Sequence, residues 1–474
     1  MENTHWLVRF VQRLGQLAGV TILLAVVGYP LLHKHCEGTV PLSLGYLAVV
    51  LGLGLGVALL CWRGGARRVL ASLSGMARRR YALVLPVSAF VLHFAVFRII
   101  QGAPIEGTRP VSYDWVFFPA SAMYPPGHHL VMQAVHFLLG PSPLADVLFE
   151  SGMIALACWL VYRLGTLAFG EATGRLAGVV LAVFPSWLLY ANLEYDLLLG
   201  TLLLLAITMF FARPPTAHGY RYLALLGLIL GLTCLVKPIA LLVPAVAFFL
   251  YLGYRVKLGQ ALKRMLVIGL FMLLAISPWT IRNYMVMDRF VLLSTNLGVV
   301  LRTSNNPETD GREFPLRPLP DETDEVEMNQ RFTREAVHWI VGHPRQFLKL
   351  AAYRIGWTWG SDSGFVSSNL YGKAPPWAVN AARGVVQIVY LALTLVWIVG
   401  ILLYRRRLLE SMIGLTILLP IVYIWGLHLV CQAHGQHHLP VIPQMIILGC
   451  CVLAHRAGVS IDGAAATAAD VGGK

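Results

Sequence analysis

The sequence predicts an all-α polytopic membrane protein with about 12 transmembrane helices, on the basis of three observations. First, 57% of its 474 residues are hydrophobic and 13% are charged, whereas a soluble domain carries roughly a quarter charged residues. Second, apolar stretches near the ~20 residues that cross a bilayer recur along most of the chain. Third, arginines gather in short segments such as 62–81 and 405–407, which the positive-inside rule assigns to the cytoplasm.

The predicted spans follow one another with mostly short connections. We expect them at residues 15–33, 42–62, 82–100, 147–169, 174–191, 195–212, 222–236, 238–254, 262–281, 378–404, 410–430 and 439–456. The first span follows Arg9 and Arg13 and is interpreted as a retained signal anchor. Both termini are then expected in the cytoplasm.

One apolar run is interrupted by Lys237-Pro238 and has two interpretations. Two short helices joined by an outer turn fit the flanking charges, since Arg213 and Arg221 precede the run and four cations follow it within residues 255–264. One kinked helix would instead invert every later span and place Arg405–Arg407 outside. The charge pattern therefore favours two helices.

Two long segments, 101–146 and 282–376, are expected on the outer face. Loops of this length in a compact protein usually carry function or a small subdomain. In the first, a Tyr124–Gly127 turn precedes a short apolar helix that lies in the membrane interface. We predict one membrane domain over 1–456 that includes both loops, and a disordered cytoplasmic tail at 457–474.

The net charge of +14 does not indicate nucleic-acid binding. Most of the excess lies in short cytoplasmic loops, where it orients the protein against anionic membrane lipids. The seven cysteines form no disulfide framework, because most lie inside or beside apolar spans and act there as small hydrophobic residues.

Acidic residues on the outer face are candidates for acid–base chemistry. Asp114 lies between aromatic residues, and a carboxylate held near the interface among apolar groups has the raised pKa that suits a general base. A loop aspartate that caps a turn is the alternative. Glu194 and Asp196 lie where one span ends and the next begins, and Asp196 is either a second site acid or a helix N-cap.

Two cations are expected at the same boundary. Lys237 lies in a very apolar run, and Arg282 lies at the outer end of a span. Together they would suit a phosphate-bearing substrate embedded in lipid. Anchoring to lipid headgroups is the alternative for each.

Histidines also gather on the outer face. They are His128, His129, His434, His437 and His438. Their spacing matches no known metal-ligand motif, so interfacial hydrogen bonding or pH-dependent charge is favoured over metal binding.

The order of these motifs resembles the bacterial polytopic glycosyltransferases of family 39, which have the GT-C fold and include aminoarabinose-transferase-like enzymes. The resemblance covers roughly residues 82–456. It is carried by an acid before a Tyr-Pro-Pro-Gly turn, an acid opening a Leu-rich helix, a Lys-Pro turn, an Arg-Asn-Tyr and Asn-Asn-Pro segment, and a final His-Leu-Pro. In this sequence these are Asp114 with Tyr124–Gly127, Asp196, Lys237-Pro238, Pro278–Tyr284 with Ser304–Pro307, and His438–Pro443.

The resemblance implies a GT-C-like bundle in the bacterial inner membrane, with two periplasmic loops that carry short interfacial helices. It also implies a polyprenyl-phosphate-sugar donor and transfer with inversion at the periplasmic face. By position, Asp114 would be the catalytic base and Asp196 a second acid, while Lys237 and Arg282 would stabilise the phosphate leaving group.

Departures from the family pattern add further candidates. The spacing from Asp114 to the Pro-Pro turn is short, which leaves Glu106 as a rival base. The family often has a basic residue beside that turn, where this sequence has Tyr124 and His128. The family also has basic residues before the last Leu-Pro, where this sequence has Gln436, His437 and His438. We therefore name as possible substrate-binding residues Glu106, Tyr124, His128, His129, Glu194, Asn305, Asn306, His437 and His438.

The predicted function is sugar transfer from a polyprenyl-phosphate donor to a glycolipid or polysaccharide, with a protein acceptor less favoured. No cofactor is required, because Lys237 and Arg282 can supply positive charge; a divalent metal is optional and no metal ligands are assigned. The alternatives are a flippase or transporter of a lipid-linked saccharide, and a glycan ligase with a lipid-diphosphate donor. Charges gathered at one face favour an enzyme over a transporter.

Overall fold

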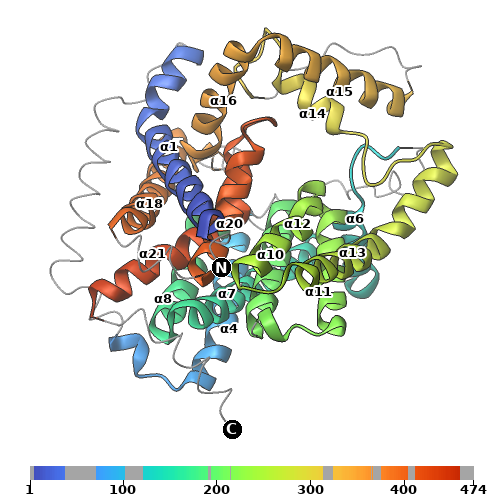
Figure 1. The fold of residues 1–474 in the computed structure, drawn as a ribbon. Helices are drawn as coiled ribbons and strands as arrows, with labels where there is room; N and C mark the ends of the chain where they lie inside the picture. The colour runs from blue at the N-terminus through green and yellow to red at the C-terminus, as the bar shows by residue number, and fades with distance from the viewer. Residues whose placement is uncertain are drawn as a thin grey trace.

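The protein is described by a computed structural model that covers residues 5–37, 71–101, 121–189, 194–213, 215–312, 324–364, 366, 375–403 and 412–458. Within these residues every regular element is a helix and no strand occurs (Figure 1), which confirms the all-α class. Five of the described helices are long and apolar enough to cross a membrane, and four shorter apolar helices accompany them. The chain is therefore a multi-pass membrane protein. The count of twelve spans stays a prediction, and the span at 42–62 lies outside the described residues.

The bundle is built from helices of very different lengths. Those of the N-terminal half are α1 (His5–Glu37), α4 (Arg78–Gln101), α6 (Gly127–Leu139), α7 (Pro143–Phe169), α8 (Glu171–Ala182), α9 (Pro185–Leu189), α10 (Glu194–Ala212) and α11 (Tyr220–Val236). Those that follow are η3 (Pro238–Leu242), α12 (Val243–Gly253), α13 (Leu258–Met287), α14 (Leu297–Ser304), α15 (Glu325–Gly342), α16 (Pro344–Trp359), α18 (Pro376–Leu403), α20 (Met412–Leu427), η4 (Gly435–Val441) and α21 (Ile442–Arg456). A short 3₁₀ turn, η2 (Pro215–Ala217), precedes α11.

Two of the predicted spans are interrupted by prolines. The span expected at 174–191 consists of α8, which ends at Ala182, and the separate short helix α9, which begins at Pro185. The residue before a proline is disfavoured in the helical region, so the helix stops there. The last span begins with the 3₁₀ turn η4, which contains Pro440, and continues as α21.

The chain reverses direction at Lys237-Pro238. Lys237 is extended, with φ −144° and ψ 130°. His218, just before α11, bonds through Nδ1 to the Tyr251 hydroxyl at 2.7 Å, near the end of α12. A single helix over these residues would separate them by roughly 50 Å. The two-helix interpretation of this apolar run is therefore correct.

Helix α13 returns alongside α11 at close range. A Cβ on Gly227 would lie 2.5 Å from the Ile268 carbonyl oxygen, and one on Gly231 would lie 2.7 Å from the Met272 carbonyl oxygen. Glycine at these positions allows the two backbones to touch. Helices α10 to α13 enclose one apolar core, and α1, α4, α7, α8, α18, α20 and α21 enclose a larger one.

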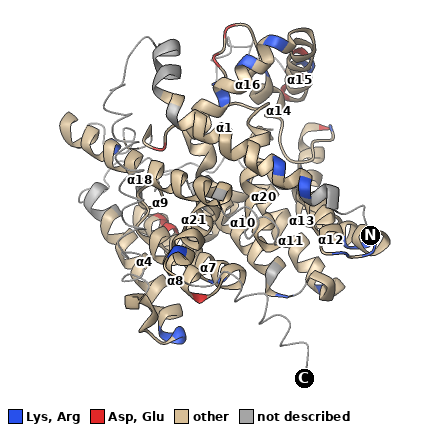
Figure 2. Cartoon of the chain, turned by 60° about the vertical axis from the view of Figure 1, so that its left-hand side comes forward, with Lys and Arg blue, Asp and Glu red and all other residues tan. Residues whose placement is uncertain are grey.

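Three helices form a charged layer beyond the apolar bundle. In Figure 1, α14, α15 and α16 lie together at one end of the molecule, away from α4 and α8. Figure 2 shows Lys, Arg, Asp and Glu on α15 and α16, while the middle of the bundle is almost entirely tan. Asp324 caps α15 by accepting from the amides of Val326 at 2.8 Å and Glu327 at 2.9 Å.

Candidate functional site

Two of the predicted site acids cannot be placed. Asp114 and its rival Glu106 lie outside the described residues. Glu194 and Asp196 open helix α10, but only their backbone is described. The predicted base and second acid therefore stay predictions, and the described site is built from the cations, the histidines and the turns around them.

The Tyr-Pro-Pro-Gly turn lies directly against the Lys237-Pro238 turn. A Cβ on Gly127 would lie 2.6 Å from the carbonyl carbon and oxygen of Leu235 and 2.7 Å from the Val236 amide nitrogen. Only glycine permits this approach of two backbones. The contact buries His128 and His129 at the start of α6 and leaves Tyr124 54% exposed. Two motifs over a hundred residues apart in the chain thus meet in space.

The segment before this turn is held by the Arg-Asn-Tyr region. Arg282 donates through Nη1 to the Ser121 carbonyl at 2.9 Å and lies over the Trp279 ring, 4.7 Å from its centroid. The amide of Ala122 donates to the Glu325 carboxylate at 3.0 Å, and its carbonyl accepts from the Thr295 amide at 2.9 Å. Arg282 is therefore joined through residues 121–127 to the backbone beside Lys237.

Histidines from two elements converge near Lys237. The rings of His428, after α20, and His437, in η4, stack with centroids 4.3 Å apart and planes 12° from parallel. His428 donates through Nδ1 to the Gln432 carbonyl at 2.8 Å. Burial is the main cause that lowers the pKa of His428 to about 4; the charges of Lys237 and Arg354 act in the same direction, and the bond to the Gln432 carbonyl acts against them. His428 is therefore neutral near pH 7.

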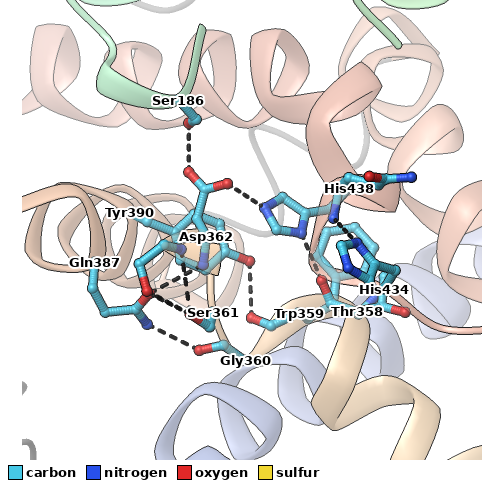
Figure 3. Close-up of polar contacts among 12 residues, drawn as sticks. Ser186, Thr358, Trp359, Gly360, Ser361, Asp362, Gln387, Tyr390, His434 and His438 are labelled. Carbon is cyan, nitrogen blue, oxygen red and sulfur yellow. Dashed lines mark hydrogen bonds and ion pairs between the residues drawn. The ribbon is translucent and has the colours of Figure 1, made fainter. Parts of the chain in front are cut away.

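His438 lies in a separate buried network rather than beside its neighbour His437. Figure 3 shows its ring between a carbonyl and a carboxylate: Nδ1 donates to the Thr358 carbonyl at 2.6 Å, and Nε2 lies 3.1 Å from Asp362 Oδ1. The Ser186 hydroxyl donates to the other oxygen of Asp362. All three side chains are at most 2% exposed. The network joins α9, the end of α16 and η4.

Two residues of α18 complete that network. Gln387 accepts from the Asp362 amide at 3.0 Å and donates to the Gly360 carbonyl at 2.9 Å (Figure 3). The Tyr390 ring stacks on His438 at 4.8 Å between centroids. Buried polar groups need partners of this kind, so the arrangement rigidly positions the segment that carries His437.

The Asn-Asn-Pro segment is held by a buried arginine. Arg354 of α16 donates to the Asn305 side-chain oxygen at 2.7 Å and to the Leu429 carbonyl at 2.7 Å, and it bonds the Ser304 carbonyl. Asn305 in turn donates to the Val430 carbonyl at 3.0 Å. Arg354 has no exposed surface, and burial lowers its pKa to about 10. It remains charged and fixes the loop after α14 to the loop after α20.

Two cavities of opposite character adjoin these groups. A polar cavity of about 560 Å³ is lined by residues 308–310, Arg312, 432–434, Gln436 and His437. An apolar cavity of about 100 Å³ is enclosed by α10, α11, η3, α12 and α20, and its wall includes Ile239, two residues after Lys237. Lys237 therefore lies beside the apolar cavity and acts electrostatically on His437 at the polar one.

The structure brings some of the predicted site residues together and gives others a supporting role. Lys237, His128, His129 and His437 belong to one region, whereas Asn305 and Asn306 support the loop and His438 lies in the buried network. In the described part of the chain, no group of three or more His, Cys, Asp or Glu side chains is arranged as a metal site. Sequence reasoning missed five residues of this region: Ser186, Glu325, Arg354, Asp362 and His428. All except His428 owe their roles to contacts with residues far away in the sequence, so no local spacing identified them. His428 contacts Gln432 and His437 nearby in the sequence, but no motif marked it.

The fold and this region define a class: a multi-pass, all-α membrane protein with a polar site at one end of its helix bundle. Within it, residues 123–281 match the family model described as dolichyl-phosphate-mannose-protein mannosyltransferase, which confirms the sequence resemblance over these residues. The match runs from the Tyr-Pro-Pro-Gly turn to the residue before Arg282. No curated protein sequence matches the chain.

The solved structures that are similar to this chain share little sequence identity with it. The archaeal oligosaccharyltransferase AglB from Archaeoglobus fulgidus, in complex with an inhibitory peptide and a dolichol-phosphate, is 12% identical with a TM-score of 0.48, covering 80% of this chain and 50% of that one. ArnT from Cupriavidus metallidurans, bound to undecaprenyl phosphate, is 14% identical with a TM-score of 0.35, covering 81% of this chain and 78% of that one. The chain thus spans about half the length of the oligosaccharyltransferase.

Proposed function

We propose that the protein is an inverting glycosyltransferase of the bacterial inner membrane. It moves a sugar from a polyprenyl-phosphate donor to a glycolipid or polysaccharide acceptor at the periplasmic face, with both termini in the cytoplasm. The family match over residues 123–281 supports transfer from a lipid phosphate. The polar end of the bundle that holds Lys237 and His437, called here the Lys237 end, is the proposed reaction site.

The observation that carries the proposal is that Lys237 relates to both cavities: it precedes Ile239 of the apolar one by two residues, and its charge acts on His437 of the polar one. A polyprenyl-phosphate sugar has an apolar chain, an anionic phosphate and a hydroxyl-rich sugar in that order. The apolar cavity at Ile239, the cation of Lys237 and the polar cavity at His437 follow the same order. A cation at a water–lipid boundary is favoured where it meets an anion.

The proposed chemistry follows from these positions and from the predicted acids. Asp114 accepts the proton of the acceptor hydroxyl, whose oxygen attacks the anomeric carbon from the face opposite the phosphate. The bond between that carbon and the phosphate oxygen breaks, and the lipid phosphate leaves with its electron pair. Lys237 and Arg282 stabilise the negative charge that develops on it. Asp196 is the proposed second acid of the site, and no metal is required.

The test is a membrane assay with radiolabelled polyprenyl-phosphate sugars. Wild-type protein is expected to transfer label into the glycolipid or polysaccharide fraction. The transfer rate of Asp114→Asn is expected to be lower by a factor of about 100 or more. Lys237→Ala is expected to raise the donor KM. Glu106→Gln is the matched control for the base. Full transfer by Asp114→Asn would remove that assignment, and loss of transfer by Glu106→Gln would move it to Glu106.

A second candidate is a glycan ligase that uses a lipid-diphosphate donor. The histidines beside Lys237 favour it, because His428 and His437 stack within the electrostatic reach of that cation. A diphosphate would place a second anionic group near these rings. Activity with polyprenyl-diphosphate oligosaccharides but not with polyprenyl-phosphate sugars would select the ligase.

A further inference from the structure

The polar cavity has two walls from segments far apart in sequence. One wall is the loop after α14, residues 308–312, and the other is the loop between α20 and α21, residues 432–437. The volume of about 560 Å³ lies within the range of small-molecule sites. Among its described lining residues Ala433 is the single apolar side chain. The cavity is therefore large enough for a ligand and unsuited to an apolar one.

The first wall is rigid. The Asn306 side-chain oxygen accepts from the amides of Glu308 at 2.9 Å and Thr309 at 3.0 Å, and the Thr309 hydroxyl donates to the Arg312 carbonyl at 2.9 Å. Gly311 has a φ of +94°, and a Cβ there would lie 3.0 Å from Arg354 Cγ. The loop is thus packed against a buried arginine, which preorganises the cavity for binding.

The two walls are bonded to each other. The Ala433 amide donates to the Gly311 carbonyl at 3.2 Å, and Arg354 holds the loop after α14 to the Leu429 carbonyl. On the second wall, His434 Nδ1 accepts from the Gln436 amide at 3.3 Å. The cavity is therefore a fixed feature of the fold rather than a gap between independent loops.

The charges of the cavity largely cancel. Arg312 forms a forked ion pair with Asp310, with Nη2 to Oδ2 at 2.7 Å and Nε to Oδ2 at 3.0 Å, and its guanidinium lies 4.2 Å from the centroid of the Trp357 ring. Glu308, Gln432 and Gln436 also line the cavity and contribute one carboxylate and two amides. Such a lining repels phosphate and offers donors and acceptors in the mixture that hydroxyl groups use.

We infer that this polar cavity is the acceptor subsite and binds a neutral, hydroxyl-rich saccharide end of the acceptor. The inference rests on the proposed function and deepens it. The lining matches a saccharide better than an anionic headgroup, because its net charge is not positive, and better than an apolar peptide side chain, because eight of its nine described lining residues have polar or charged side chains. His437 lines this cavity and is electrostatically coupled to Lys237, which places the acceptor next to the proposed donor phosphate.

The test is a double variant, Gln432→Ala with Gln436→Ala, which removes two side-chain amides and keeps both backbones. The donor is a radiolabelled polyprenyl-phosphate sugar, and the acceptor is titrated in two arms, extracted glycolipid and extracted polysaccharide. Loss of two hydrogen bonds is expected to raise the acceptor KM about tenfold, with the donor KM unchanged. Gln346→Ala, an exposed glutamine on α16, is the matched control and is expected to change neither value.

The outcomes separate the two claims. An unchanged acceptor KM in both arms, with transfer intact, would overturn the subsite and leave the proposed function standing. A raised donor KM would assign the cavity to the donor and would also overturn it. Absence of transfer by the wild-type protein from every polyprenyl-phosphate sugar tested would overturn both. A larger effect in one arm identifies the acceptor's source and supports the inference.

Discussion

At the scale of single residues, two residues shape the Lys237 end. At one, a larger side chain would not fit; at the other, loss of the side chain would leave buried carbonyls without hydrogen-bond donors. Gly127 allows the Tyr-Pro-Pro-Gly turn to touch the end of α11. Arg354 satisfies carbonyls from two loops, the one after α14 and the one after α20. Both residues contact main-chain atoms of other segments, so they define the shape of the site and take no part in its proposed chemistry.

Gly127→Ala is expected to destabilise the protein by about 1–3 kcal/mol, because the new methyl group meets main-chain atoms that cannot move aside. Thermal unfolding of the protein in detergent micelles measures the effect. Gly152→Ala in α7 is the matched control, since a Cβ there meets no atom within 4 Å, and alanine in a helix is expected to be neutral or stabilising. Equal melting temperatures for the two variants would contradict the close contact.

Arg354→Ala is expected to lower stability by about 3 kcal/mol, because it removes charged hydrogen bonds and leaves buried carbonyls unsatisfied. Arg345→Ala, an exposed arginine on the same helix, should change stability by less than about 0.5 kcal/mol. Thermal unfolding of the two variants side by side gives the comparison. If Arg345→Ala lost as much stability as Arg354→Ala, the positive charge of α16 would be the cause, and not the buried hydrogen bonds of Arg354.

At the scale of elements, helix breaks create the site. Lys237-Pro238 ends α11, Pro185 separates α9 from α8, and Pro440 lies in the 3₁₀ turn η4 before α21. Each break brings polar side chains or backbone to the same end of the bundle. Helix ends leave polar backbone groups unpaired, and these ends are joined by side chains such as those of Ser186, Asp362 and His438.

The end of α20 is expected to make stability depend on pH through His428. Its pKa is about 4 in the fold and about 6.5 when exposed, so between these values the unfolded chain binds a proton that the folded chain does not. Stability is therefore complete above pH 6.5 and falls as the pH drops toward 4, by at most roughly 1.4 kcal/mol per unit. Unfolding temperatures measured from pH 7.5 to 4.5 test this slope.

The variant His428→Asn isolates that contribution. Its amide can still donate to the Gln432 carbonyl, but it does not titrate, so the loss of stability below pH 6.5 is expected to become shallower. His338→Asn on the exposed side of α15 is the matched control and should keep the wild-type slope. A wild-type slope in His428→Asn would assign the pH dependence to other groups.

At the scale of the whole molecule, the arrangement has two ends of different composition. The Lys237 end carries the histidines, both turns and the charged layer α14 to α16. The opposite end carries the starts of α11 and α13, where Arg264 donates to the Pro215 and Thr216 carbonyls. From the positive-inside rule we predict that this opposite end faces the cytoplasm.

Cysteine labelling tests that orientation. In a variant without the native cysteines, an impermeant thiol reagent added to intact cells is expected to modify Lys349→Cys on α16 and to leave Lys263→Cys at the start of α13 unmodified. Both positions are exposed, so each should react after the cells are opened. Modification of position 263 alone would invert the proposed topology and move the reaction site to the cytoplasm.

The sequence by itself determined the all-α membrane class, the reversal at Lys237-Pro238 and the motifs that resemble the glycosyltransferase family. These follow from local composition, charge placement and proline, which act within a few residues. Only the tertiary structure decided that His437 lines a polar cavity while its neighbour His438 is buried with Asp362, and that Arg354 joins two distant loops. The reason is physical: burial, hydrogen-bond partners and cavities arise between segments that are far apart in the sequence, and no local pattern encodes them.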